Sequence, residues 1–403
     1  MIGIREIEEA RARIDEHIVT TPCARSEWFS KLTGSKTYFK LENLQMTGSF
    51  KERGALNKLL TLTAEERSHG VIAASAGNHA QGVAAHAGRL GIPATIVMPD
   101  RTPIIKVENT RSFGAKVVLA GANFDEAYAE ARRLQEQQGL TFVHPFDDDM
   151  VIAGQGTIGL ELLEQNPYLE TVIVPIGGGG LISGIAVAIK EVNPRIRVIG
   201  VQTEALPSMK ASVAAGEPVT VPPGRTIADG IAVKRPGENT LQYVRRYVDD
   251  IVTVSEEEIA NAILLLLERE KSVAEGAGAA SVAALIHGHV PSAKGRKTGM
   301  IVSGGNIDVN MIARVIEKGL VKDGRLVRLV VQIEDRPGGL ARLLALVAEY
   351  GGNVIEIHHD RAFGKSAFGD TEVELTLEAR GRQHVDELKA GLARAGYGIS
   401  EQA

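Results

Sequence analysis

Four short segments of this sequence carry residue types that could do chemistry together. The first is SFKERGA at residues 49–55, in which Lys51 stands just before helix-forming residues. A lysine forms a Schiff base with an aldehyde once its amine is partly deprotonated, and a helix N-terminus lowers the pKa of an amine. Taken alone, Lys51 is more often a solvated surface lysine and Phe50 a core residue. This segment therefore gains meaning only from the other three.

The second segment is SAGNHAQG at residues 75–82, which directly follows the apolar run 71–74. A strand, a turn of small residues and a helix expose free backbone N–H groups at the helix start, which bind anions such as a substrate carboxylate. The side chain of Asn78 could donate to a phenolate-like oxygen, or it could only cap the helix. We expect His79 to support this loop on its substrate side and not to act as a catalyst.

Two further segments follow apolar runs. In PIGGGGL at residues 175–181, four glycines let backbone amides close around a phosphate. The segment is not a P-loop, because Ile185 stands where that motif has lysine, and Ile182 takes the place of the last glycine of a dinucleotide fingerprint. The fourth segment, SGGN at residues 303–306, follows another apolar run, at the sheet edge where ligands bind.

Together the four segments offer what a pyridoxal phosphate ring needs at its aldehyde, ring oxygen, phosphate and ring nitrogen. They resemble the motifs of the threonine/serine dehydratases of the tryptophan-synthase-β-like pyridoxal-phosphate fold, and ADGIAV at residues 228–233 also fits that family. The resemblance covers residues 1–320. It implies pyridoxal 5'-phosphate as the cofactor and Lys51 as the catalytic Schiff-base lysine.

The resemblance also implies a set of binding residues. The cofactor would be held by Phe50, Lys51, Asn78, Gly177, Gly178, Gly179, Gly180, Leu181 and Ser303. The substrate would meet Ser75, Gly77, Asn78 and His79.

In such a site Lys51, once released from the aldehyde, would act as the base for the Cα proton. A hydroxyl at Ser303 leaves the ring nitrogen neutral, which favours prompt β-elimination over aminotransfer. The related serine racemases have a serine where this chain has Ala76, so racemisation should be weak. They also hold a cation with an acidic residue at the position of Gln202, so we expect no bound metal but allow a monovalent ion.

The elements that must position these segments alternate along the chain. Apolar runs and helix-like stretches follow one another over the first 320 residues, which indicates parallel sheets covered on both faces. The fold class is therefore α/β, doubly wound, in a two-lobed catalytic domain over residues 1–322 whose smaller lobe spans roughly 43–150. Helix-like stretches are expected at residues 80–90, 125–138 and 181–192, and apolar runs at residues 71–74, 94–98, 116–120, 171–176, 197–201 and 300–302.

The pattern changes after a polar turn at residues 323–325. Residues 326–403 read as βαββα, a small α+β domain. DRPGGL at residues 335–340 stands between its first strand and helix and resembles an ACT domain, which implies binding of small amino acids between paired copies. A dimerisation module without a ligand is the alternative.

Composition limits the class of protein. The net charge of −5, with no basic block, argues against a nucleic-acid partner. One cysteine, Cys23, cannot form an internal disulfide and suggests a reducing cytosol. No apolar run reaches 18 residues and no secretory signal is present, so we expect a cytoplasmic homodimer or homotetramer without a membrane partner.

Three functions stay open. The first is dehydration and deamination of L-threonine to 2-oxobutanoate and ammonia, with L-serine as a secondary substrate and a branched-chain amino acid as effector. The second is another enzyme of the same fold, such as a serine racemase, serine dehydratase or cysteine synthase. The third is an amino-acid sensor without catalysis, against which the intact lysine and glycine run argue.

Overall fold

The computed structural model describes residues 1–360 and 369–402, which form two compact units, Met1–Ile307 and Asp308–Ala403. Helix α14 (Val309–Lys322) groups with the second unit, whereas the sequence prediction put residues up to 322 in the first. The predicted domain bounds, 1–322 and 326–403, remain a prediction. Within the described part of the chain, no helix is long and apolar enough to cross a membrane.

The larger sheet of the first unit has the strand order β1-β2-β10-β7-β8-β9, and every neighbouring pair except β1–β2 is parallel. All five residues of β7 are buried, as expected for a central strand covered on both faces. The strands are β1 (Cys23–Ser26), β2 (Lys36–Leu41), β7 (Thr171–Pro175), β8 (Arg197–Thr203), β9 (Asp250–Val254) and β10 (Lys297–Val302).

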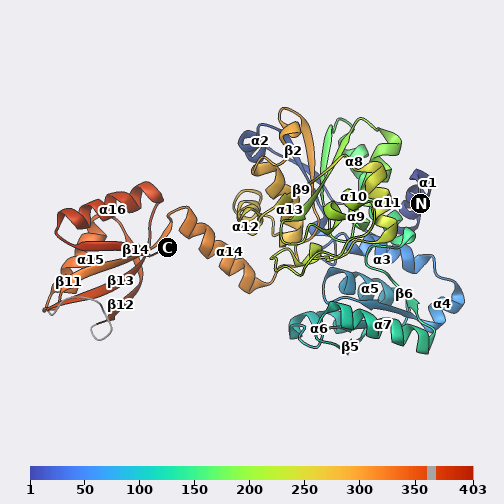
Figure 1. Ribbon diagram of the computed structural model, residues 1–403, viewed down its shortest axis with the longest axis horizontal. Coiled ribbons are helices and arrows are strands. Elements are labelled where there is room, and N and C mark those ends of the chain that lie inside the picture. Colours follow the sequence, from blue (N-terminus) through green and yellow to red (C-terminus); the bar gives the residue numbers. More distant parts are fainter. Residues whose placement is uncertain (361–368, 403) are drawn as a thin grey trace. The chain divides into compact units, whose positions relative to one another are not determined.

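Helices surround this sheet and pack closely on one another (Figure 1). Helices α8 and α9 approach closely, because a Cβ on Gly184 would stand 2.5 Å from the backbone N of Gly156. Only glycine permits that contact. The helices are α1 (Ile4–Ile14), α2 (Glu27–Thr33), α8 (Asp149–Gln165), α9 (Gly180–Val192), α10 (Ser208–Ala215), α11 (Glu238–Tyr247), α12 (Glu256–Leu265) and α13 (Gly276–Ile286).

The smaller sheet has the all-parallel order β5-β4-β3-β6. Alternate residues of β3 enter different cores: Val71 and Ala73 join the cluster that includes α3 and α5, and Ile72 and Ala74 join the one that includes α7. Helices therefore cover both faces. The elements are α3 (Lys51–Leu60), α4 (Ala64–His69), β3 (Val71–Ala74), α5 (Asn78–Arg89), β4 (Ala94–Met98), α6 (Ile104–Ser112), β5 (Lys116–Leu119), α7 (Phe124–Gln138) and β6 (Thr141–Phe142). The predicted α/β class with two lobes is confirmed.

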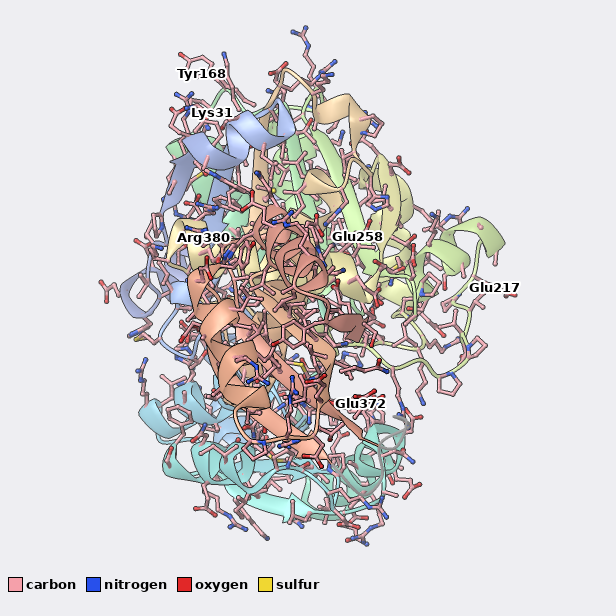
Figure 2. The ribbon with its side chains drawn as sticks, turned by 90° about the vertical axis from the view of Figure 1, so that its left-hand side faces the viewer. Lys31, Tyr168, Glu217, Glu258, Glu372 and Arg380 are labelled. Carbon is pink, nitrogen blue, oxygen red and sulfur yellow. The ribbon has the colours of Figure 1, made fainter. Side chains whose placement is uncertain are left out.

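The parallel strands of the larger sheet point their carboxyl ends toward the smaller lobe. Tyr168, which precedes β7 and is exposed, lies at the end of the larger lobe away from the smaller one (Figure 2). The segments that follow β3, β7 and β10 are the predicted chemical segments. Because β7 and β10 are parallel neighbours, the segments that follow them lie together at the carboxyl edge of the larger sheet, and the segment after β3 lies at the carboxyl edge of the smaller sheet.

The second unit contains an antiparallel sheet of order β12-β13-β11-β14. Every second residue of β11, from Val327 to Ile333, is buried, and the same core holds Leu343 of α15 and Leu388 of α16. The elements after α14 are β11 (Leu326–Glu334), α15 (Gly339–Glu349), β12 (Asn353–Asp360), β13 (Asp370–Glu378), α16 (Arg382–Arg394) and β14 (Gly398–Gln402). The predicted βαββα order is confirmed. The prediction did not include the last strand, β14, because its five residues carry too little apolar pattern to indicate a strand.

Candidate active site

A cavity of about 590 Å³ is lined by the segments at these two carboxyl edges, and so by residues of both lobes. All of the predicted site residues border it. They are Phe50, Lys51, Ser75, Gly77, Asn78, His79, Gly177, Gly178, Gly179, Gly180, Leu181 and Ser303. The four segments, which are far apart in the sequence, therefore meet in one place.

Lys51 is the first residue of α3 and faces this cavity. Its Nζ donates a hydrogen bond to the Pro145 carbonyl at 2.6 Å and lies 5.2 Å from the centre of the Phe50 ring. Burial lowers the pKa of Lys51 to about 8, against a smaller opposing effect of Glu275. A larger fraction of this amine is therefore neutral at physiological pH than of an ordinary lysine, as a nucleophilic amine requires.

The chain before Lys51 is tied to the larger sheet. The backbone N–H of Phe50 donates to the carbonyl of Ser303 at 3.1 Å, and Ser49 forms an isolated antiparallel bridge with Gly304. Ser303 is buried and directly follows β10. The first and fourth segments are thus held side by side by backbone contacts.

The four glycines connect β7 to α9. Gly179 has φ +101°, a conformation that favours glycine, and it is the N-cap of α9. A Cβ on Gly180 would stand 2.8 Å from the Phe146 carbonyl, and a Cβ on Gly178 would overlap the Phe146 ring. The absence of side chains therefore keeps this loop close to Phe146 and leaves its amides open to the cavity at a helix N-terminus, where anions bind.

A chain of hydrogen bonds from neighbouring residues holds this glycine loop in place. The Thr240 hydroxyl donates to the Gly178 carbonyl at 2.6 Å, and the Asp147 carboxylate accepts from the Thr240 backbone N at 3.0 Å. The His144 Nδ1 in turn accepts from the Asp147 N at 2.8 Å. Burial lowers the pKa of His144 to about 4, so the ring is neutral and can accept. Sequence reasoning gave His144, Asp147 and Thr240 no role, because their partners are distant or lie in irregular loops.

Asn78 is the first residue of α5, and the N-cap position belongs to Gly77. The Asn78 side chain is held from two sides: its Oδ1 accepts from Asn306 Nδ2 at 2.8 Å, and its Nδ2 donates to Glu275 Oε1 at 2.7 Å. The capping alternative therefore does not describe this geometry. One Nδ2 hydrogen remains for a ligand in the cavity.

The remaining predicted substrate residues form the turn after β3. The Ser75 hydroxyl accepts from the Gly77 N at 3.2 Å, and a Cβ on Gly77 would meet nothing within 4 Å. His79 is buried and its Nε2 lies 2.8 Å from the Val143 carbonyl, to which it donates. Burial, with a smaller effect of Lys51, lowers the pKa of His79 to about 3. His79 is therefore neutral, which suits the predicted supporting role.

Gln202 occupies the position where the related racemases have an acidic cation ligand. It is buried, and its side chain contacts backbone groups of the larger lobe. Its Oε1 accepts from the Lys210 N at 2.9 Å, and its Nε2 lies 3.4 Å from the Ile176 carbonyl. Among the described residues, no cluster of three or more potential metal ligands occurs.

Sequence reasoning missed Glu275, a charged residue that borders the cavity and is bonded to a predicted site residue. It is buried, precedes α13 as its N-cap, and accepts the hydrogen bond from Asn78. Burial and the nearby Asp229 raise the pKa of Glu275 to about 7. Its neighbours in the sequence are small and apolar, so no local pattern marks it.

Two family models match this chain. Residues 14–304 match the model described as pyridoxal-phosphate dependent enzyme, and residues 327–390 match the ACT domain. An L-threonine ammonia-lyase of Thermotoga maritima is 53% identical over 399 residues, which cover 99% of both chains. One of Geobacter sulfurreducens is 52% identical over 397 residues, with 98% of both chains covered. The solved structure of maize serine racemase superposes with a TM-score of 0.75 at 39% identity, over 79% of this chain and 98% of that one.

Proposed function

The chain belongs to the family of pyridoxal-phosphate-dependent enzymes and carries an ACT domain, and on this premise we propose that it is an L-threonine ammonia-lyase. The reaction eliminates water from L-threonine and takes up one water in the hydrolysis that releases ammonia, so its products are 2-oxobutanoate and ammonia. Conversion of L-serine to pyruvate and ammonia would be a secondary activity. The observation that carries the proposal is the meeting of Lys51, Asn78 and the glycine loop in one cavity.

The residues that border the cavity are of the types that would hold the cofactor. A Cβ on Gly178 or Gly180 would fill the space beside Phe146, so the bare loop is suited to a phosphate group. Lys51, Asn78 and Ser303 border the same cavity, where they would meet the aldehyde, the ring oxygen and the ring nitrogen, respectively. Bound there, pyridoxal phosphate would supply an electron sink for the electrons released at the substrate Cα.

Residues of the cavity would bind the substrate and transfer its proton. The turn of Ser75, Gly77 and Asn78 would bind the substrate carboxylate through backbone N–H groups at the start of α5. Lys51, whose pKa is lowered to about 8, would take the Cα proton. Ala76 also borders the cavity and offers no group that exchanges a proton, so we expect elimination to dominate over racemisation.

A direct test uses the purified full-length protein with L-threonine and L-serine. We expect visible absorbance from bound cofactor and production of 2-oxobutanoate. The Lys51→Ala variant should lose turnover, whereas Lys31→Ala, which changes an exposed lysine on α2, should keep it (Figure 2). A colourless wild-type protein that makes no 2-oxo acid would refute the proposal.

A second candidate activity is serine racemisation, which the likeness to maize serine racemase favours. Chiral analysis of the same L-serine reactions separates the two. D-serine formed faster than pyruvate would replace ammonia-lyase by racemase as the main activity.

We also propose that the ACT domain binds a branched-chain amino acid that regulates the enzyme. A cavity of about 690 Å³ lies at the turn between β11 and α15 and is bordered by residues 335–338, Leu340 and Ala341. Deletion of residues 326–403 should leave dehydration intact and abolish the response to isoleucine or valine. Ala341→Trp, which fills the cavity, should weaken the response, and Ala348→Trp on the same helix should not. Unchanged inhibition in the truncated protein would contradict this assignment.

The same proposal includes a homodimer or homotetramer in the cytoplasm. Paired ACT domains require at least two copies, and the lone Cys23 suits a reducing compartment. Light scattering over a range of protein concentrations measures the number of copies, and a monomer at all of them would exclude paired ACT domains.

A further inference from the structure

Glu275 is a buried carboxylate that borders the cavity and has no role in the proposed reaction. Only 5% of its surface is exposed, and it stands at the start of α13, whose first five residues are glycines and alanines. A buried acid costs free energy unless it is bonded or paired. Its position there therefore calls for a partner, and the partner is the side chain of Asn78.

The bond to Glu275 is one link in a short polar chain. Glu275 Oε1 accepts from Asn78 Nδ2 at 2.7 Å, Asn78 Oδ1 accepts from Asn306 Nδ2 at 2.8 Å, and Asn306 Nδ2 also donates to the Thr47 carbonyl at 2.7 Å. Asn306 can only donate at this nitrogen, and an ionised Glu275 can only accept. The two partners therefore fix which end of the Asn78 amide is oxygen and prevent it from flipping.

The charge on Glu275 decides how strongly this arrangement holds. A hydrogen bond to a carboxylate is roughly twice as strong as one between neutral groups. The charged groups around Glu275 come from three other elements: Asp229 of η3 (Asp229–Ile231), Lys106 of α6 and Lys51 of α3. Asp229 opposes ionisation, while Lys106 and Lys51 favour it. Burial and Asp229 outweigh the two lysines and raise the pKa of Glu275 to about 7, so its charge changes near neutrality.

We propose that Glu275 is a positioning residue, whose ionised carboxylate locks the Asn78 amide so that its second N–H is offered to the cofactor ring oxygen. This inference rests on the proposed function. Loss of the charge, by substitution or by protonation, should weaken cofactor binding by about tenfold, as expected when a charge-assisted hydrogen bond becomes a neutral one.

The test compares Glu275→Gln with the wild type by titration of the apoprotein with pyridoxal phosphate at several pH values. Wild type should bind about tenfold more tightly at pH 8.5. The difference should close as the pH falls to about 5.5, because Glu275 is then protonated and is uncharged, like the glutamine of the variant. Glu257→Gln, the same change at an exposed position of α12, should bind like the wild type at every pH. Equal affinities of Glu275→Gln and wild type at pH 8.5 would overturn the inference.

Two further measurements keep the inference testable. Glu275→Asp keeps the charge but is one methylene shorter than the 2.7 Å bond to Asn78 requires, so it should also bind more weakly. Wild-type affinity in Glu275→Asp would count against the positioning role, even if Glu275→Gln failed to fold. Apoprotein stability gives an independent reading. Because burial raises the pKa of Glu275, wild-type stability should fall more between pH 5 and 7.5 than that of Glu275→Gln.

The outcomes separate this inference from the proposed function. A wild type that dehydrates threonine while Glu275→Gln matches its cofactor affinity at every pH leaves the function standing and removes Glu275 from the site. A wild type that binds cofactor with the expected difference from Glu275→Gln but makes no 2-oxobutanoate refutes the function and supports the positioning role.

Discussion

Substitution of Gly178 by alanine tests the glycine loop most directly. The φ of Gly178 is not in the left-handed region, so alanine brings no backbone strain there. Its Cβ, however, would lie closer than 3.0 Å to three atoms of the Phe146 ring, which is well inside ordinary contact distance. The effect of this variant therefore comes from one steric overlap.

Neither side of that overlap can move freely. The Gly178 carbonyl is bonded to Thr240, and the backbone next to Phe146 is bonded to His144 and, through Asp147, to α11. Overpacking of this kind costs about 1–3 kcal/mol. If the strain is relieved by a shift of the loop away from its phosphate-binding position, cofactor affinity should fall by about 5- to 150-fold.

The assay is titration of apoprotein with pyridoxal phosphate, followed by absorbance. Gly178→Ala should bind weakly, and the double variant Gly178→Ala/Phe146→Ala should return to within about threefold of Phe146→Ala alone, because the overlap is then removed. Two results would refute the reasoning: a Gly178→Ala protein within twofold of wild type, or a double variant that binds no better than Gly178→Ala.

Three other predictions concern residues elsewhere in the first unit. Arg53→Met should lower the free energy of unfolding by about 3–5 kcal/mol in urea titrations, because buried Glu42 and Glu161 lose their shared partner; a loss below about 1 kcal/mol would contradict this. Attachment of pyridoxal phosphate to the apoprotein should accelerate with pH, reach half its maximum rate near pH 8 and level off above that, since burial lowers the pKa of Lys51 to about 8; stopped-flow rates still rising at pH 10 would argue against it. Ala76→Ser should increase D-serine formation from L-serine in chiral chromatography, and no increase would weaken the role given to Ala76.

The sequence predicted the fold class and the segments that border the cavity because both depend on patterns of consecutive residues. Buried parallel strands appear as continuous apolar runs, and a glycine loop or a strand-to-helix turn occupies consecutive residues. Lys51, residues 75–79, residues 177–181 and Ser303 could therefore be identified one segment at a time. Their individual roles remain predictions that the variants described above test. The short edge strand β14 escaped prediction because five residues with little apolar pattern carry no such local signal.

Only the tertiary structure decided which groups support those segments. Glu275 meets Asn78 across 197 positions of sequence, and Arg53 meets Glu161 across 108. Whether such a charged residue is solvated or buried, and which partner it finds, depends on how the helices pack and not on its neighbours in the chain. The sequence by itself determined where a cofactor lysine and a phosphate loop could stand. The packing determined that the buried Glu275 accepts a hydrogen bond from Asn78, because hydrogen bonds and ionisation depend on distance and burial in space.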